Sequence, residues 1–244
     1  FQNYKTDRMK WVKDLYDAIS KFDISLPTPI MAGVRSPQRQ FSSCVLIETD
    51  DSLDSINATA SAIVKYVSQK AGIGIGGGSI RAVGSPIRNG DASHTGVIPF
   101  YKHFQSAVKS CSQGGVRGGA ATLYYPLWHY EVEDILVLKN NKGTEDNRIR
   151  HLDYGVQFNK VMYERLLSGG NITLFSPSDV PDLYEAFYNN VDAFRELYEK
   201  YERSKVRKKT IPAIDLFSTF VTERKDTGRI YLMNVDHCNE HGSF

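Results

Sequence analysis

Short apolar runs that suit β-strands alternate with longer stretches of helical periodicity along this chain, and this alternation limits the fold more than any other feature. Strand patterns occur at residues 41–48, 172–175 and 229–233. Helical periodicity occurs at residues 9–19, 53–70, 99–111, 128–139, 156–167, 181–201 and 211–225. Because alternating strands and helices build βαβ units, the sequence predicts an α/β fold with a largely parallel sheet.

The strand around Cys44 and the helix after it carry the clearest local signals. Residues 44–47 form a short apolar run with β-branched members, which is typical of a strand buried on both faces. Asp50, Asp51 and Ser52 are N-cap residue types, so we expect a helix to begin directly after them. That helix should end at the glycines from Gly72 onward.

Charge and hydropathy exclude several classes of protein. The 244 residues include 30 Lys and Arg against 28 Asp and Glu, a formal charge of +2, which gives no support for binding to nucleic acid. No apolar run approaches the roughly 18 residues that span a bilayer, and residues 1–10 lack the apolar core of a signal peptide. We therefore expect a cytoplasmic protein without a membrane anchor. Because the chain begins at Phe1 rather than methionine, we also expect a segment of a longer polypeptide.

The glycine-rich run at residues 72–78 is the first candidate binding element. Glycines let a backbone approach phosphate closely, and Arg81 and Arg88 follow with guanidinium groups that pair with phosphate oxygens. The dinucleotide-binding fingerprint must follow a strand and open a helix, whereas these glycines follow a helix, so we reject that interpretation. A phosphate-binding loop is one hypothesis, and solvated surface arginines are the other.

A second glycine-rich loop covers residues 112–121. So many glycines cost conformational entropy that a merely structural connection does not require, so we expect a mobile loop that responds to a ligand. The loop presents Gln113 and Arg117 as its candidate contact residues. The alternative is a tight crossing of chain segments, in which glycine is needed only for space.

The three cysteines lack metal-ligand spacing, and no metal site is predicted. By itself Cys44 is best interpreted as a buried apolar thiol. Cys238 lies within residues 236–240, and since adjacent residues rarely converge into catalytic geometry, a structural role is favoured over a nucleophile or a ligand. The basic cluster at residues 205–209 is interpreted as a solvated connection between helices.

Five motifs follow one another in order along the chain: LPTPI at residues 26–30, FSSCVL at 41–46, DSL at 51–53, SQGGVRGGA at 112–120 and NVDHCN at 234–239. Together they resemble the class I ribonucleotide reductase large subunit of the enterobacterial and phage type. The resemblance covers essentially all 244 residues. It implies the first part of a ten-stranded α/β barrel made of two parallel five-stranded halves. Residues 1–24 would be a helical lead-in, and residues 25–244 the first half-barrel.

The resemblance also implies which residues meet the substrate. Cys44 matches the redox-active thiol of the family, which delivers reducing equivalents to the ribose 2′ position of a ribonucleoside diphosphate. Thr28 and Ser43 match positions that hold the diphosphate or ribose, and Gly72 matches a glycine whose backbone approaches the substrate. The implied activity is the reduction of ribonucleoside diphosphates to deoxyribonucleoside diphosphates by radical chemistry.

The same resemblance implies allosteric control by nucleotides. An effector site for a deoxynucleoside triphosphate or ATP would use an acidic group for a ribose hydroxyl and arginines for phosphates. The matching positions are Asp51, Ser52, Leu53, Arg81 and Arg88. The loop with Gln113 and Arg117 would carry the signal to the substrate site. The helices at 53–70 and 99–111 would pair with their copies in a homodimer.

Further components are implied by the resemblance as well. No cofactor is expected to bind this chain directly, because the family's diiron-tyrosyl radical resides in a small subunit and thioredoxin or glutaredoxin is the final reductant. The family's radical motif is Asn-x-Cys-x-Glu, whereas residues 236–240 read DHCNE, so Cys238 is not taken as the radical cysteine. The segment is therefore expected to need the remainder of the large subunit for activity. The alternatives are a nucleotide-binding regulatory module without catalysis and an α/β domain without a ligand.

Overall fold

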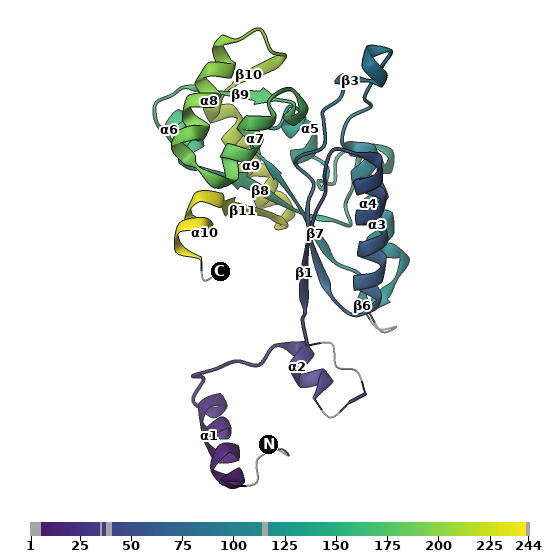
Figure 1. The fold of residues 1–244 in the computed structure, drawn as a ribbon, viewed down its shortest axis with the longest axis vertical. Helices are drawn as coiled ribbons and strands as arrows, with labels where there is room; N and C mark the ends of the chain where they lie inside the picture. Colours follow the sequence, from purple (N-terminus) through teal and green to yellow (C-terminus); the bar gives the residue numbers. More distant parts are fainter. Residues whose placement is uncertain (1–5, 35, 38–40, 114–116, 243–244) are drawn as a thin grey trace. The chain divides into compact units, whose positions relative to one another are not determined.

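The computed structural model describes residues 6–34, 36–37, 41–113 and 117–242, and contacts divide the chain into two units (Figure 1). Among its described residues the first unit, Phe1–Ser43, holds the helices α1 (Arg8–Ser20) and α2 (Thr28–Gly33). The helix predicted at residues 9–19 is confirmed by α1. Pro29 lies in the first turn of α2, where a missing N–H leaves no helical hydrogen bond unmade. The second unit, Cys44–Phe244, contains the sheet.

A five-stranded parallel sheet forms the centre of the second unit (Figure 1). Its strands lie side by side in the order β1 (Cys44–Glu48), β2 (Gly72–Gly76), β7 (Ala121–Pro126), β8 (Asp153–Phe158) and β11 (Ile230–Asn234). Every neighbouring pair is parallel. The predicted α/β class is therefore confirmed, and the strands share one amino edge and one carboxyl edge.

Two helices connect the first three strands and cover the sheet. Helix α3 (Leu53–Ser68) runs between β1 and β2, α4 (Ile98–Ser110) runs between β2 and β7, and the two helices pack against each other. Ile56 and Ile63 on the apolar face of α3 belong to the same buried core as Ile73 and Ile75 of β2. Because each buried aliphatic side chain stabilises the fold by about 1.5–3 kcal/mol, this layer holds α3 firmly against the strands.

The rest of the unit adds mostly helices. They are α5 (Val132–Leu136), α6 (Lys160–Leu167), α7 (Pro181–Asn189), α8 (Val191–Arg203), α9 (Ala213–Thr227) and α10 (Val235–His241). An antiparallel pair, β9 (Asn171–Phe175) with β10 (Lys208–Pro212), accompanies them. Trp128 is fully buried against the rings of Tyr184, Phe187 and Phe194. Aromatic pairs of this kind add about 0.5–1.5 kcal/mol beyond burial, so the cluster ties α7 and α8 to the segment after β7.

Short elements complete the described residues. The hairpins are β3 (Pro86–Ile87) with β4 (Ala92–Ser93) and β5 (Ser112–Gln113) with β6 (Arg117–Gly118). The 3₁₀ turns are η1 (Arg88–Gly90), η2 (Glu145–Asn147) and η3 (Pro177–Asp179). Within the part of the chain that the structure describes, no helix has the length and hydropathy needed to cross a bilayer.

Two expectations about strands are wrong. Residues 44–47 are not buried on both faces, because β1 lies at the edge of the sheet: Leu46 is 85% exposed, while Val45 and Ile47 pack against the core. The run at residues 72–78 is not a loop, because its first five residues form β2. Hydrogen bonds from β1 and β7 on either side hold this glycine-rich stretch extended despite its low strand propensity.

Three predicted helices merge different elements or extend too far. Residues 181–201 contain two helices, α7 and α8, with Asn190 as the N-cap of the second. Residues 156–167 contain the end of β8 and then α6, and the boundary lies at Asn159, whose side chain accepts a hydrogen bond from the Val161 N–H. Residues 128–139 contain only the short helix α5. Strand β8 is buried at nearly every position, and periodicity cannot distinguish such a run from a buried helix.

Candidate functional site

One face of the sheet carries alternate side chains of β1. Cys44, Leu46 and Glu48 share this face, because residues two apart in a strand point the same way. The parallel register sets Cys44 beside Gly72 and Glu48 beside Gly76 on β2. A Cβ atom at Gly76 would collide with the Glu48 carboxylate. Glycine in β2 therefore gives the side chains of β1 room to lie across the neighbouring strand.

A row of hydrogen bonds crosses this face from β1 to β8. The Tyr184 hydroxyl donates to Glu48 Oε1 at 3.3 Å, and the Tyr188 hydroxyl donates to Gln157 Oε1 at 2.8 Å. The two tyrosine hydroxyls are 3.3 Å apart. Burial raises the pKa of the Glu48 carboxyl, which the hydrogen bond from Tyr184 partly offsets. None of these four residues was predicted as a site residue, although the polar and apolar alternation of β1 marks Glu48 as a neighbour of Cys44.

The predicted substrate residues are divided between the two units. Cys44 and Gly72 are register partners at the amino ends of β1 and β2, and Cys44 is exposed. Thr28 begins α2, and Ser43 is the last residue of the first unit. The structure thus brings Cys44 and Gly72 side by side, and it describes Thr28 and Ser43 within a separate unit.

Asp51 and Arg81 meet beyond the carboxyl ends of the same two strands. Arg81 Nε donates to Asp51 Oδ2 at 2.7 Å, and the Arg81 backbone N–H donates to Asp51 Oδ1 at 3.0 Å. Arg81 Nη1 also donates to the Pro86 carbonyl at 3.0 Å. The side chains are 29% exposed for Arg81 and 23% for Asp51. The carboxylate therefore orients a guanidinium group that a ligand from solution can reach.

Ser52 and Leu53 begin helix α3 directly after Asp51. The Ser52 side chain is the N-cap and accepts a hydrogen bond from the Ser55 N–H at 3.1 Å. Leu53, the first helical residue, is 67% exposed. The unpaired N–H groups and the dipole at a helix amino end favour negative charge. The structure thus gathers Asp51, Ser52 and Leu53 at a helix terminus that suits an anionic ligand.

Arg88 lies in the turn between β3 and β4. It is exposed and has a backbone φ of 52°, and Asn89 beside it has a φ of 57°. Residues other than glycine rarely adopt this left-handed backbone conformation, which costs roughly 1–2 kcal/mol. Because Arg81 bonds to the Pro86 carbonyl at the start of this hairpin, the hairpin that carries Arg88 is attached to the pair of Asp51 and Arg81.

The second glycine-rich loop contains the hairpin of β5 and β6. Gln113 pairs with Arg117 through the backbone in this hairpin. The side chains of both residues, and all of residues 114–116, lie outside the described part of the chain. Helix α3 contacts β5, so the helix that begins beside Asp51 also touches this loop.

The same loop returns to the amino edge of the sheet. The Ile73 N–H donates to the Ala120 carbonyl at 3.2 Å, so the loop ends beside the start of β2, where Gly72 lies. A Cβ atom at Gly119 would lie 2.8 Å from Val67 Cγ1 and would collide with a backbone carbonyl of α4. Glycine is therefore needed at position 119 for space, which is the tight crossing of chain segments predicted as the alternative for this loop.

Comparison with known proteins decides the family. The family model described as ribonucleotide reductase, barrel domain, matches residues 42–244. The chain belongs to this family. The ribonucleoside-diphosphate reductase subunit alpha of Haemophilus influenzae is 70% identical over the whole chain, the ribonucleoside-diphosphate reductase 1 subunit alpha of Escherichia coli is 68% identical, and the subunit alpha of Enterobacteria phage T4 is 58% identical. The chain spans 32% of the length of each of these relatives. The resemblance inferred from the five motifs is confirmed.

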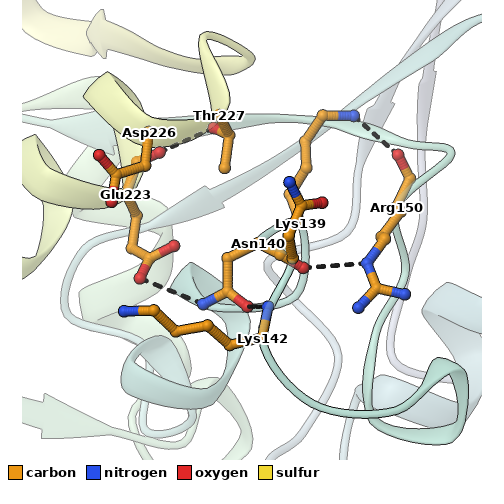
Figure 2. A pocket seen from close by; sticks show the side chains of 8 residues that line it. Lys139, Asn140, Lys142, Arg150, Glu223, Asp226 and Thr227 are labelled. Carbon is orange, nitrogen blue, oxygen red and sulfur yellow. Dashed lines mark hydrogen bonds between the residues drawn. The ribbon is translucent and has the colours of Figure 1, made fainter.

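The chain also has a pocket that contains none of the predicted site residues (Figure 2). It has a volume of about 420 Å³ and is lined by Lys139, Asn140, Asn141, Lys142, Arg150, Glu223, Asp226 and Thr227. Asn140 Nδ2 donates to Glu223 Oε1 at 3.2 Å, and Arg150 Nε donates to the Asn140 carbonyl at 2.9 Å. The lining residues therefore largely bind one another. Among the described residues, no group of three or more His, Cys, Asp and Glu side chains is arranged to hold a metal ion.

Proposed function

We propose that this chain is the part of a ribonucleoside-diphosphate reductase alpha subunit in which a substrate site and an effector site share two strands. The full subunit would reduce ribonucleoside diphosphates to deoxyribonucleoside diphosphates, and residues 25–244 would form the first half of its ten-stranded barrel. The observation that carries the proposal is the arrangement of two strands. Cys44 and Gly72 lie at the amino ends of β1 and β2, and Asp51 and Arg81 lie beyond their carboxyl ends.

Cys44 is proposed as a redox-active thiol. In the net reaction the ribose 2′ hydroxyl would leave as water, while Cys44 and a second thiol outside this segment would be oxidised to a disulfide. Its exposure at the sheet edge supports this role, since a buried thiol could not meet the substrate. Gly72 beside it would let the substrate approach the backbone, and the hydroxyls of Thr28 and Ser43 would hold the diphosphate or ribose.

The effector site is proposed for a deoxynucleoside triphosphate or ATP. Asp51 offers acceptor oxygens for a ribose hydroxyl, and Arg81 and Arg88 offer guanidinium groups for the phosphates. Ser52 and Leu53 would add the amino end of α3. The bond between Asp51 and Arg81 supports the proposal, because it holds both groups at one place on the surface.

Helix α3 would couple the effector site to the substrate site. It has 16 residues, and at 1.5 Å per residue it is roughly 24 Å long. Its amino end lies beside Asp51, and it contacts β5 in the loop that carries Gln113 and Arg117. That loop rejoins the sheet beside Gly72. Nucleotide binding would therefore change the loop that borders the substrate, which is allostery between two sites through one connecting element.

The complete enzyme would require further components. A small subunit would supply the diiron-tyrosyl radical, the remainder of the alpha subunit would supply the radical cysteine, and thioredoxin or glutaredoxin would restore the thiols. Helices α3 and α4 are proposed to pair with the same helices of a second alpha subunit. The exposed side chains of Leu53 and Tyr66 on α3 support this interface, because they present apolar surface that a partner would cover.

Two substitutions in the full-length subunit test the two sites separately. Arg81→Ala should weaken the binding of dATP, dGTP, dTTP and ATP in equilibrium dialysis, because a guanidinium partner of the phosphates is lost. Cys44→Ser should abolish ribonucleoside diphosphate reduction while nucleotide binding stays unchanged. Unchanged affinity in Arg81→Ala would remove Arg81 from the effector site. An active Cys44→Ser enzyme would refute the redox role and favour a purely regulatory module.

A further inference from the structure

The segment that carries Arg81 is held in place by side chains from distant parts of the chain. This effector segment, residues 80–97, runs from the end of β2 to the start of α4 and includes the β3–β4 hairpin. Side chains from three later regions bind its backbone or its buried serine. They are His129, Glu131, Ser176 and Arg207. None of these four was predicted as a site residue.

Glu131 joins the two ends of the effector segment. Its Oε2 accepts hydrogen bonds from the Val83 N–H at 2.8 Å and from the Val97 N–H at 3.2 Å. The residue is only 5% exposed. Burial raises the pKa of the Glu131 carboxyl, while the two backbone N–H groups and the nearby Arg207 act in the opposite direction. One buried carboxylate therefore closes the segment into a loop.

Arg207 binds the effector segment beside Glu131. Its Nη1 donates to the Val83 carbonyl at 2.6 Å, and its Nη2 donates to Ser85 Oγ at 2.8 Å. The guanidinium group lies 4.6 Å from the centre of the Tyr130 ring, and Nε is 3.5 Å from an oxygen of Asp179. A planar fork that donates two bonds while stacked on a ring has one defined orientation, which lysine could not reproduce.

The interpretation of residues 205–209 as a solvated connection is therefore wrong for Arg207. The backbone of the effector segment leaves room for the Arg207 guanidinium group at Gly84. Gly84 has a φ of +78°, which other residues rarely adopt, and a Cβ atom there would lie 2.9 Å from Arg207 Nη1. Long-range packing, rather than charge pattern, decides the environment of this arginine.

The residues on both sides of Arg81 are anchored as well. The Ile80 carbonyl and His129 Nε2 are 3.1 Å apart and hydrogen bonded, and the Ala82 N–H donates to Ser176 Oγ at 3.0 Å. Arg81 therefore projects toward Asp51 from a stretch of backbone that is fixed before and after it.

We propose that Arg207 and Glu131 are positioning residues for the effector site, which hold the backbone around Arg81 in the conformation that a bound nucleotide requires. This inference rests on the proposed function of Arg81. A site that is already ordered binds more tightly, because less conformational entropy is lost on binding. Without Arg207 the segment loses two charge-assisted bonds and gains alternative conformations that the nucleotide must exclude.

The test compares two arginines in the full-length subunit. Arg207→Ala should weaken binding of dATP, dGTP, dTTP and ATP in equilibrium dialysis by about tenfold, which is about 1.4 kcal/mol. Arg207→Lys should be impaired in the same direction, because a single ammonium cannot make both bonds. Arg165→Ala is the matched control, since Arg165 pairs with Glu202 at 2.7 Å and lies 5.7 Å from the Tyr198 ring. It should leave nucleotide affinity within about twofold of the wild type.

Two further measurements separate positioning from general damage. Reductase activity without effector and the thermal unfolding midpoint should be similar in Arg207→Ala and Arg165→Ala. The inference is overturned if Arg207→Ala keeps wild-type affinity for all four nucleotides while Arg81→Ala does not, or if Arg165→Ala weakens binding equally. If Arg207→Ala does not fold, Arg207→Lys is measured instead, and wild-type affinity of Arg207→Lys for all four nucleotides overturns the inference. If Arg81→Ala also binds normally, the effector site is misplaced and this inference is refuted with it.

Discussion

Replacing Asn140 with alanine should destabilise the polar pocket between the residues after α5 and the end of α9 (Figure 2). Asn140 is 7% exposed, and its Nδ2 donates to Glu223 Oε1 at 3.2 Å. Its Oδ1 accepts from the Lys142 N–H at 3.0 Å and from Arg148 Nε at 2.9 Å. Alanine removes all of these bonds and leaves the Glu223 carboxylate without the amide donor.

The expected magnitude follows from the burial of Glu223. This residue is 8% exposed, and within the described residues its Oε2 already lacks a hydrogen-bond partner. A buried polar group left unpaired costs about 1–3 kcal/mol, and a charged group costs more. We therefore expect Asn140→Ala to destabilise this region by about 3 kcal/mol, which is roughly a 100-fold change in the local opening equilibrium.

Hydrogen exchange measured by mass spectrometry on the full-length subunit can detect this local change. In Asn140→Ala, peptides that cover residues 139–150 and 220–227 should exchange roughly 100-fold faster, while peptides of α3 should be unchanged. Asn141→Ala is the control, because Asn141 lines the same pocket with an exposed side chain. Equal exchange rates in the two variants would refute the argument that the buried bonds of Asn140 stabilise the pocket.

Three other perturbations have defined outcomes. Gly155→Ala should reduce stability to thermal unfolding by about 1–3 kcal/mol, because a Cβ atom would collide with the Tyr124 ring. Adding Tyr124→Ala to this variant should relieve the clash. Asn190→Ala should cost about 1 kcal/mol in urea unfolding and Asn190→Gly only a few tenths, since Asn190 Oδ1 caps two N–H groups of α8 at 3.0 Å. Burial lowers the pKa of His129 from 6.5 to about 4, so the folded imidazole stays neutral while the unfolded chain takes up a proton. The shifted pKa of His129 contributes about 3 kcal/mol to the free energy of unfolding, which should be present above pH 6.5 and lost as the pH falls toward 4. The raised pKa of Glu131 has the opposite effect, because it lowers the stability of the fold as the pH rises. If His129→Gln lost as much stability toward acid pH in urea unfolding as the wild type, His129 would not be the source of the loss.

Helix α3 was predictable from its own residues. Ser52 is the N-cap in the structure, as its residue type indicated, and Ile56 and Ile63 face the core at helical spacing. The start of α9 and the strand β11 also agree with their local patterns within a few residues. Capping and periodicity involve only near neighbours in the chain, so they can be read without the fold.

Strands β2, β7 and β8 of the sheet were not predicted, and the reasons differ for β2 and β8. The alternating glycines of β2 have low strand propensity, and only pairing with β1 and β7 makes that stretch extended. Strand β8 is buried almost throughout, so it lacks the alternation that distinguishes a strand from a helix. In both cases the neighbouring strands, which are distant in sequence, decide the local conformation.

The ordered motifs were sufficient to name the family and to propose Cys44, Asp51 and Arg81 as site residues. They could not show that Asp51 bonds to Arg81, that Tyr184 donates a hydrogen bond to Glu48, or that Arg207 holds the effector segment. These relations arise where β1, β2 and the later regions of the unit pack around one core. Motifs and caps depend on interactions between near neighbours, whereas contacts between residues far apart in the chain depend on the order of the strands and on the packing of every side chain between them.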